Sequence, residues 1–305
     1  MKGFYKLKTT LANTFSQDVV TTLSLIDSLI NPILLYACEY WGCLKLPKNN
    51  PIENLNMMMC KQILGVQKQT TNYGVLLELG KTPLHIQAKK LAIKNWERIR
   101  QGKANEILLT SCRENSNTWD LAIKECLEIN GLLYFYENSN YNDKSAFAHK
   151  RLFQTLCDQF HQNAFAAIQR EESKLRTYAI FKTKIGIENY LSKIKNSAVR
   201  TQISKFRLSN HRLRIETGRH KNQARECRTC PFCPNCIETE IHFLFYCPVY
   251  NQIRERLGKK INEKRLTDEQ KLILLLADTD NEIAHYISKT LELREFLLRK
   301  HKIHG

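Results

Sequence analysis

The chain has 305 residues and a formal net charge of +17, from 47 lysines and arginines against 30 aspartates and glutamates. A hydrophobic content of 43% is sufficient for a packed core. The charge is typical of proteins that bind nucleic acid or an anionic surface. The most apolar run, residues 19–38, contains Asp27 and Pro32, whereas a membrane span needs about 20 apolar residues with few or no charges. We therefore expect no membrane partner.

Cysteine usage indicates the cellular compartment. The chain has 11 cysteines, an odd number, and its basic first residues are not followed by the apolar stretch of a secretory signal. Disulfides are rare in reducing compartments. We therefore expect free thiols and a cytoplasmic or nuclear location.

The first 130 residues predict helices with recognisable ends. Asn31 and Thr82 each precede a proline, a pair typical of a helix start. In residues 84–99 the apolar side chains recur on one helical face. Gly80 and Gly131 predict helix ends, because glycine adopts the left-handed conformation that closes many helices.

The later part of the chain also favours helices. Thr267 and Gln270 form a capping-box pattern, and residues 281–300 have the periodicity of an amphipathic helix. Only residues 211–218, HRLRIETG, alternate as a strand does. The predicted fold class is mostly α, with four parts: residues 1–110 helical, 111–173 a helical connector, 174–258 a basic region, and 259–305 C-terminal helices.

The positive charge is concentrated in one stretch. Residues 174–260 contain 19 lysines and arginines but six acidic residues, and the same stretch holds five clustered cysteines. A basic region around a candidate metal site is typical of nucleic-acid-binding proteins.

The segment CRTCPFCPNCIETEIHFLFYC, residues 227–247, has the spacing of a zinc site. Cys230 and Cys233 form a C-x2-C knuckle, and His242 and Cys247 supply a second pair eight residues later. Tetrahedral zinc takes four such ligands, so we predict a CCHC zinc site.

Two further thiols leave an alternative open. Cys227 and Cys236 extend the knuckle to C-x2-C-x2-C-x2-C, a spacing that also suits an iron–sulfur cluster. That cluster would leave His242 and Cys247 without a role. The remaining six cysteines are expected to be small core residues.

Several ordered stretches resemble one known family. LIDSLINPILLYACEYWG, residues 25–42, and IENLNMMMCKQILGVQKQTTNYGVLLELGKTPL, residues 52–84, resemble the segment that follows the polymerase palm in non-LTR (LINE-like) retrotransposon reverse transcriptases. Residues 174–220 resemble the family's basic block, and residues 230–254 resemble its CCHC knuckle. Ala37 stands where the family usually has glycine.

The resemblance implies a thumb-like region over residues 1–110 and a C-terminal nucleic-acid grip. It places the knuckle ligands on Cys230, Cys233, His242 and Cys247. It also implies a role in target-primed reverse transcription, in which RNA or DNA is held by this part of the polymerase.

The residues themselves suggest where nucleic acid binds. Five basic side chains lie in or beside the possible strand, with Phe206 available for stacking on a base. They are Arg207, His211, Arg212, Arg214 and Arg219.

We do not expect this chain to be an enzyme. The sequence has no Asp-Asp pair of the kind that holds polymerase metals, and it has no phosphate-binding loop. The leading hypothesis is a nucleic-acid-binding fragment of a reverse transcriptase. The alternative is a zinc-stapled helical module that binds other proteins.

Overall fold

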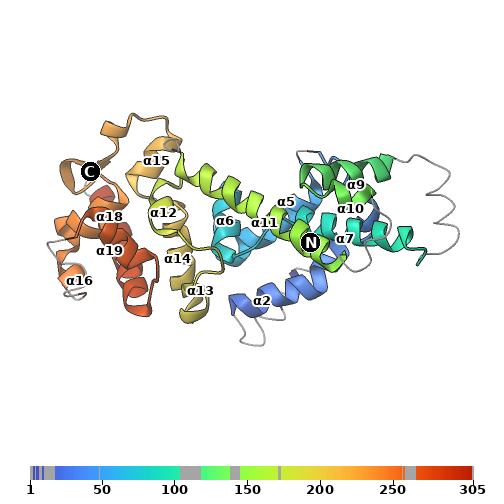
Figure 1. The fold of residues 1–305 in the computed structure, drawn as a ribbon. Helices are drawn as coiled ribbons and strands as arrows, with labels where there is room; N and C mark the ends of the chain where they lie inside the picture. Colours follow the sequence, from blue (N-terminus) through green and yellow to red (C-terminus); the bar gives the residue numbers. More distant parts are fainter. Residues whose placement is uncertain are drawn as a thin grey trace. The chain divides into compact units, whose positions relative to one another are not determined.

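The computed structural model describes most of the chain and confirms a mostly α fold (Figure 1). Helices make up 71% of it, and β1 (Thr229–Cys230) and β2 (Cys233–Ile237) form a two-stranded sheet. The described residues are Gly3, Tyr5, Lys6, Thr9, 18–47, 49–103, 118–137, 145–170, 173–255, 257 and 266–303.

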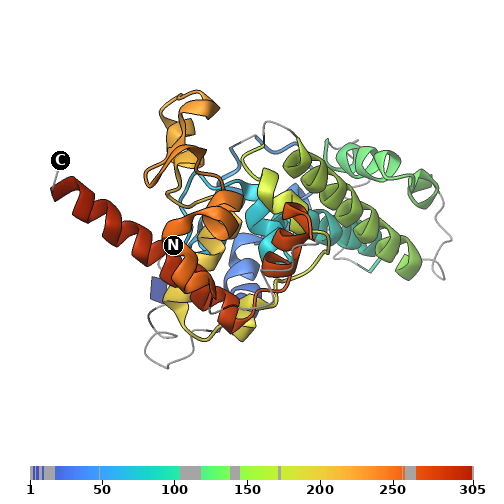
Figure 2. The same cartoon turned by 90° about the vertical axis from the view of Figure 1, so that its left-hand side faces the viewer.

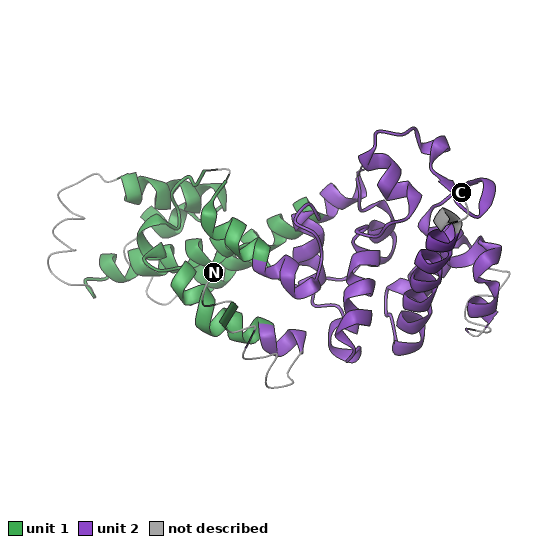
Figure 3. Ribbon diagram, turned by 180° about the vertical axis from the view of Figure 1, so that it is seen from behind, with its two compact units in different colours: residues 1–7, 23–58, 81–164 green, residues 8–22, 59–80, 165–305 purple. Residues whose placement is uncertain are grey.

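Contacts divide the chain into two compact units, shown in different colours in Figure 3. Unit 1 contains residues 1–7, 23–58 and 81–164, and unit 2 contains residues 8–22, 59–80 and 165–305. Helices α5 (Pro51–Leu64) and α11 (Ser145–Gln169) contribute residues to both units. The four-part division remains a prediction.

Unit 1 is built around helix α7 (Leu84–Arg100), which packs against α4 (Cys38–Trp41) and α9 (Thr118–Ile129). Its buried side chains include Ala88, Ala92, Trp96 and Ile99, so the predicted apolar face is confirmed. Helix α10 (Leu133–Glu137) packs against α9. The chain leaves α9 through Gly131 in the left-handed conformation, also as predicted.

The predicted helix start at Asn31 is wrong. Helical structure is continuous there, through α2 (Val19–Leu25), the π-helical η1 (Ile26–Ile30) and α3 (Asn31–Leu34). Proline lacks an N–H, and its ring clashes with the carbonyl four residues earlier. Insertion of a π turn before Pro32 relieves both problems without ending the helix.

Ala37 adopts a conformation that favours glycine. It precedes α4 with φ of 55° and ψ of 20°, in the left-handed region. A residue with a Cβ pays about 1–2 kcal/mol there. A glycine at this position would avoid this cost.

Unit 2 joins a segment near residue 80 to the C-terminal half of the chain. Helix α14 (Ser197–Arg207) packs against α19 (Asn281–Ile303), the long C-terminal helix in Figure 2. Helix α12 (Arg176–Phe181) packs against α18 (Asp268–Leu276). The predicted capping box before α18 and the predicted amphipathic helix α19 are both confirmed. Shorter elements of unit 2 are α13 (Tyr190–Lys193), η5 (Pro248–Tyr250) and α16 (Asn251–Glu255).

The end of α6 (Asn72–Leu79) is fixed by a close approach of two backbones. Gly80 ends this helix with φ of 61°, as predicted. A Cβ at Gly80 would lie 2.3 Å from the backbone nitrogen of Ile187, and the N–H of Glu188 donates to the carbonyl of Glu78 at 3.1 Å. This position therefore requires glycine for space as well as for conformation.

Among the described residues, none of the helices combines the length and apolar composition needed to cross a bilayer.

Candidate metal centre

The knuckle is a tight hairpin between β1 and β2, in the segment that follows α15 (Arg214–His220) (Figure 1). The antiparallel register pairs Cys230 with Cys233 across a turn at Pro231 and Phe232. Side chains of paired residues lie on the same face of a sheet. The hairpin therefore brings both sulfurs to one side.

The second pair of ligands is placed by a π-helical turn, η4 (His242–Tyr246). The N–H of Cys247 donates to the carbonyl of His242 at 2.8 Å, which is the i to i+5 bond of a π-helix. In an α-helix, with about 3.6 residues per turn, residues five apart point to different sides. The wider turn returns Cys247 to the side of His242.

These two local structures bring Cys230, Cys233, His242 and Cys247 together. One ligand atom from each lies within 4.8 Å of all the others, and the three cysteines are buried. The Sγ atoms of Cys233 and Cys247 are 3.7 Å apart. The Nε2 atom of His242 is enclosed and has no hydrogen-bond partner among the described residues. A buried imidazole nitrogen without a partner, in a residue that is grouped with three thiols, is an unsatisfied group that a metal ion would satisfy.

One thiol of the group is already acidic. A hydrogen bond from Cys247 lowers the pKa of Cys230 and favours its thiolate form, while the same contact and burial raise the pKa of Cys247. The thiolate is the form that binds metals. The group can therefore hold a metal ion.

Cys227 and Cys236 lie outside this group. Both are exposed, while Cys230 and Cys233 are grouped with His242 and Cys247. This grouping favours the CCHC ligand set over the four-cysteine alternative.

Aromatic side chains pack against η4, the turn that contains His242. Phe243 is fully buried between Phe206 and Tyr250, with ring centroids 5.8 and 5.1 Å away. Phe206 is 2% exposed, so the prediction that it stacks on a base is wrong. Its role is to pack the knuckle against α14.

Glu238 connects the knuckle to two helices, a role that no local sequence pattern indicated. Its carboxylate accepts the backbone N–H of Arg214 at 2.6 Å, at the start of α15. It also accepts two hydrogen bonds from the guanidinium of Arg294 in α19, at 2.6 and 2.8 Å. The residue before α15 is Leu213, whose side chain cannot cap a helix. Glu238, 24 residues away, supplies the missing acceptor.

This capping explains why the predicted strand at residues 211–218 is wrong. Residues 211–215 do alternate between buried and exposed, but α15 begins at Arg214. The alternating residues include the extended segment that leads into α15, a helix whose capping residue is distant in sequence. It was therefore not visible as a local helix signal.

The prediction that Arg207 contacts nucleic acid is also wrong. Arg207 is 1% exposed, and its Nε donates to Glu78 at 2.6 Å while the guanidinium also pairs with Glu188 and the carbonyl of Leu276. The guanidinium lies over the Phe181 ring, 4.7 Å from its centroid. A cation enclosed in this way is not available to phosphate.

His211 is likewise buried. Its Nε2 lies 3.1 Å from the carboxylate of Glu240, and its ring packs against Phe206. His211 thus holds the knuckle in place, and the prediction that it binds nucleic acid is wrong.

The other three predicted contacts lie at the surface to different degrees. The side chain of Arg212 is 81% exposed, and Arg214 is exposed. Arg219 is partly exposed and pairs with Glu216 at 2.8 Å. Their contact with nucleic acid remains a prediction.

Acidic and basic side chains are separated around the knuckle. Glu216, Glu238 and Glu240 are at most 2% exposed, and each pairs with arginine or histidine. The exposed charges of α15 and the loop after it are mostly basic. We use the name α15 basic surface for four exposed residues: Arg214 in α15, Arg212 just before it, and Lys221 and Arg225 after it. Arg212 also lies 3.9 Å from Glu295.

The fold and the site define a mostly α-helical protein with a CCHC group that can hold a metal ion. No family model, no curated protein and no solved structure matches the chain.

Proposed function

We propose that the chain binds single-stranded nucleic acid through the α15 basic surface, which a zinc-bound knuckle holds in position. The observation that carries the proposal is the separation of charge around the knuckle. Three acids are buried and paired, while Arg212, Arg214, Lys221 and Arg225 are exposed. Exposed lysines and arginines that neutralise phosphates supply most of the affinity for nucleic acid.

Zinc is the metal that the ligands fit best. Three thiols and one imidazole are a common set for structural zinc. With Zn–S bonds of about 2.3 Å, sulfurs at two corners of a tetrahedron are about 3.8 Å apart, and Cys233 and Cys247 are separated by 3.7 Å. Bound zinc would fix η4 relative to the hairpin. Glu238, which follows the hairpin and caps α15, would in turn hold α15 in place. An iron–sulfur protein would instead absorb visible light.

The resemblance to non-LTR reverse transcriptases supports the same function. The resembling blocks include the knuckle and α15, where that family has its C-terminal nucleic-acid grip. The proposed role is to hold template RNA or primer DNA during target-primed reverse transcription, with the catalytic aspartates supplied elsewhere. We therefore expect no primer extension by this chain on a primed RNA template with Mg²⁺.

The salt dependence of binding tests the proposal. Each phosphate neutralised on a single strand contributes about 0.7 to the slope of log K against log salt. Changing Arg212, Arg214, Lys221 and Arg225 to glutamine should therefore reduce the slope for a labelled RNA by about 3. Because these side chains are exposed, the melting temperature should change little.

A matched variant controls for loss of net charge. Lys94, Arg98, Lys150 and Arg151 are four exposed basic residues of α7 and α11. Their change to glutamine removes the same charge but should leave most of the slope intact. Equal slopes for the wild type and the α15 variant would refute the proposal and favour the protein-interaction module.

A further inference from the structure

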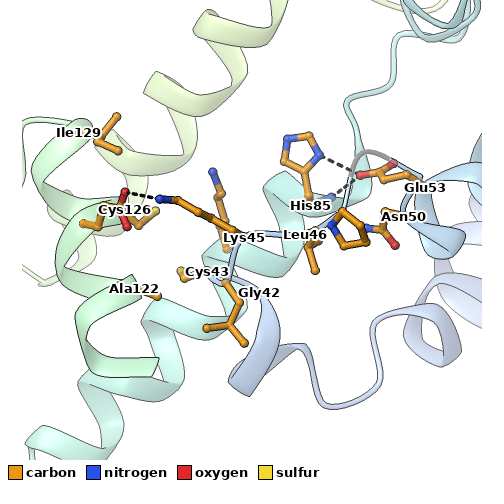
Figure 4. Close-up of a pocket in the computed structure, with 14 residues that line it drawn as sticks. Gly42, Cys43, Lys45, Leu46, Asn50, Glu53, His85, Ala122, Cys126 and Ile129 are labelled. Atoms are coloured by element: carbon orange, nitrogen blue, oxygen red, sulfur yellow. Dashed lines mark hydrogen bonds and ion pairs between the residues drawn. The ribbon is translucent and has the colours of Figure 1, made fainter. Parts of the chain in front are cut away.

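Unit 1 contains a pocket that the proposed function does not use. Its volume is about 410 Å³, within the range of about 300–1,000 Å³ in which small ligands bind. The loop after α4, the start of α7 and helix α9 line it (Figure 4). The site is therefore built from three separate segments of one unit.

Two cysteines lie in the wall of this pocket. Cys43 follows α4, Cys126 lies in α9, and both line the cavity (Figure 4). Each thiol shifts the pKa of the other, so the two groups lie near one another, and neither is in a disulfide. From the sequence they were expected to be unrelated core residues. The fold instead brings together two thiols that are 83 positions apart, of which Cys43 is partly exposed and Cys126 is buried except where it lines the cavity.

The two thiols are not chemically equivalent. The contact with the Cys43 thiol, opposed by burial and assisted by the charge of Lys89, lowers the pKa of Cys126 to about 7. The same contact, together with burial, raises the pKa of Cys43. Cys126 is thus the nucleophile of the pair, since the thiolate is the reactive form.

The charges of the pocket indicate what the ligand carries. Lys45 pairs with Glu125 at 3.3 Å, and His85 pairs with Glu53 at 2.9 Å. Lys89 also lines the pocket, and it has no carboxylate partner among the described residues. It is placed to receive a carboxylate from a bound molecule.

We infer that Cys43 and Cys126 form a dithiol site that reduces a small, carboxylate-bearing disulfide bound in this pocket. The Cys126 thiolate attacks one sulfur of the disulfide, forms a mixed disulfide and expels the first small thiolate. Cys43 then loses its proton to solvent and attacks the Cys126 sulfur, which expels the second. Two protein thiols are oxidised to one disulfide, and one small disulfide is reduced to two thiols.

Oxidised glutathione is the probe for this reaction, used with the full-length, metal-loaded chain. In the wild type, proteolysis and mass spectrometry should find a disulfide between the peptides that carry Cys43 and Cys126. Cys43→Ser should stop at a mixed disulfide on Cys126, and Cys126→Ser should give neither product. Lys89→Met should slow the reaction with oxidised glutathione more than the reaction with cystamine, which has no carboxylate.

Two controls separate this chemistry from general thiol oxidation. Cys38→Ser removes a buried thiol near Cys43 in sequence and should leave the Cys43–Cys126 disulfide intact. Burial raises the pKa of Cys38 to about 11. With a Brønsted coefficient of about 0.4–0.5, iodoacetamide at pH 7 should alkylate Cys126 on the order of 100-fold faster than Cys38 in the wild type. Equal alkylation rates, or no Cys43–Cys126 disulfide at any glutathione ratio, would overturn the inference.

Discussion

Replacing Arg207 by methionine should destabilise unit 2 without changing its contacts with phosphate. The change removes the ion pair with Glu78, at 2.6 Å, and the pairing with Glu188. Glu78 is 0% exposed, so its charge would be left enclosed without a partner. Breaking a buried pair in this way costs about 3–5 kcal/mol.

The tryptophans provide an internal reference for this measurement. All three, Trp41, Trp96 and Trp119, lie in unit 1. In urea titrations of Arg207→Met, far-UV circular dichroism should show an early transition from unit 2, while tryptophan fluorescence keeps its wild-type midpoint. With a urea m-value of about 2 kcal/mol/M, a loss of 4 kcal/mol moves the unit 2 midpoint by about 2 M.

A second substitution tests whether the enclosed carboxylate causes the loss. In the double variant Arg207→Met with Glu78→Gln, the charge is removed along with its partner, and at least half of the stability should return. A loss under about 1 kcal/mol in the single variant would refute this reasoning. A salt slope of RNA binding reduced by about 0.7 with unchanged stability would show instead that Arg207 contacts a phosphate.

Three further predictions concern other sites. Cys233→Ser should lose the zinc that elemental analysis finds in the wild type, whereas Cys236→Ser should retain it; full zinc in the first variant would disprove the ligand assignment. Gly80→Ala should cost more than about 2 kcal/mol in urea unfolding, because its Cβ meets the backbone of the segment at residues 186–187. Gly131 also has a positive φ, but a Cβ added there would have no atom of the described residues within 4 Å. Gly131→Ala should therefore cost about 1 kcal/mol. Equal losses of stability in the two variants would contradict the steric argument. Despite burial, hydrogen bonds from His85 lower the pKa of Glu53. The contribution of the ionised Glu53 to the free energy of unfolding is therefore complete at pH values above 4.5, the ordinary pKa of a glutamate. It is lost as the pH falls through the lowered pKa of the folded state. When unfolding is followed by tryptophan fluorescence at a series of pH values, the stability of Glu53→Gln should fall less than that of the wild type as the pH is lowered.

Local sequence signals predicted the helix ends well. Gly131 and the capping box at Thr267 act within a few residues of their own backbone, so their effect does not depend on the rest of the fold. Gly80 also makes room for the backbone at residues 186–187, and the proline signal at Asn31 did not start a helix. The four ligands were also predictable, because a hairpin and one helical turn are enough to bring them together.

Signals that depend on distant partners were missed. The cap of α15 comes from Glu238, and the charge of Arg207 is neutralised by Glu78, 129 positions earlier in the chain. The pairing of Cys43 with Cys126 likewise requires the packing of unit 1. Arg207 was predicted to face solvent because it lies in a basic region. Only the tertiary structure shows that it pairs with Glu78 and Glu188.

The π turn at His242–Tyr246 determines how the spacing of the ligands can vary between related proteins. Deletion of one residue from this turn would convert it to an α turn, in which residues four apart lie on the same side. His242 and the displaced cysteine would still share a face, so H-x3-C and H-x4-C are interchangeable lengths for this site. After insertion of one residue the two ligands would be six positions apart, and no regular helical turn is wide enough to keep them on the same side. Among natural variants of this knuckle, we therefore expect shortened spacers but not lengthened ones.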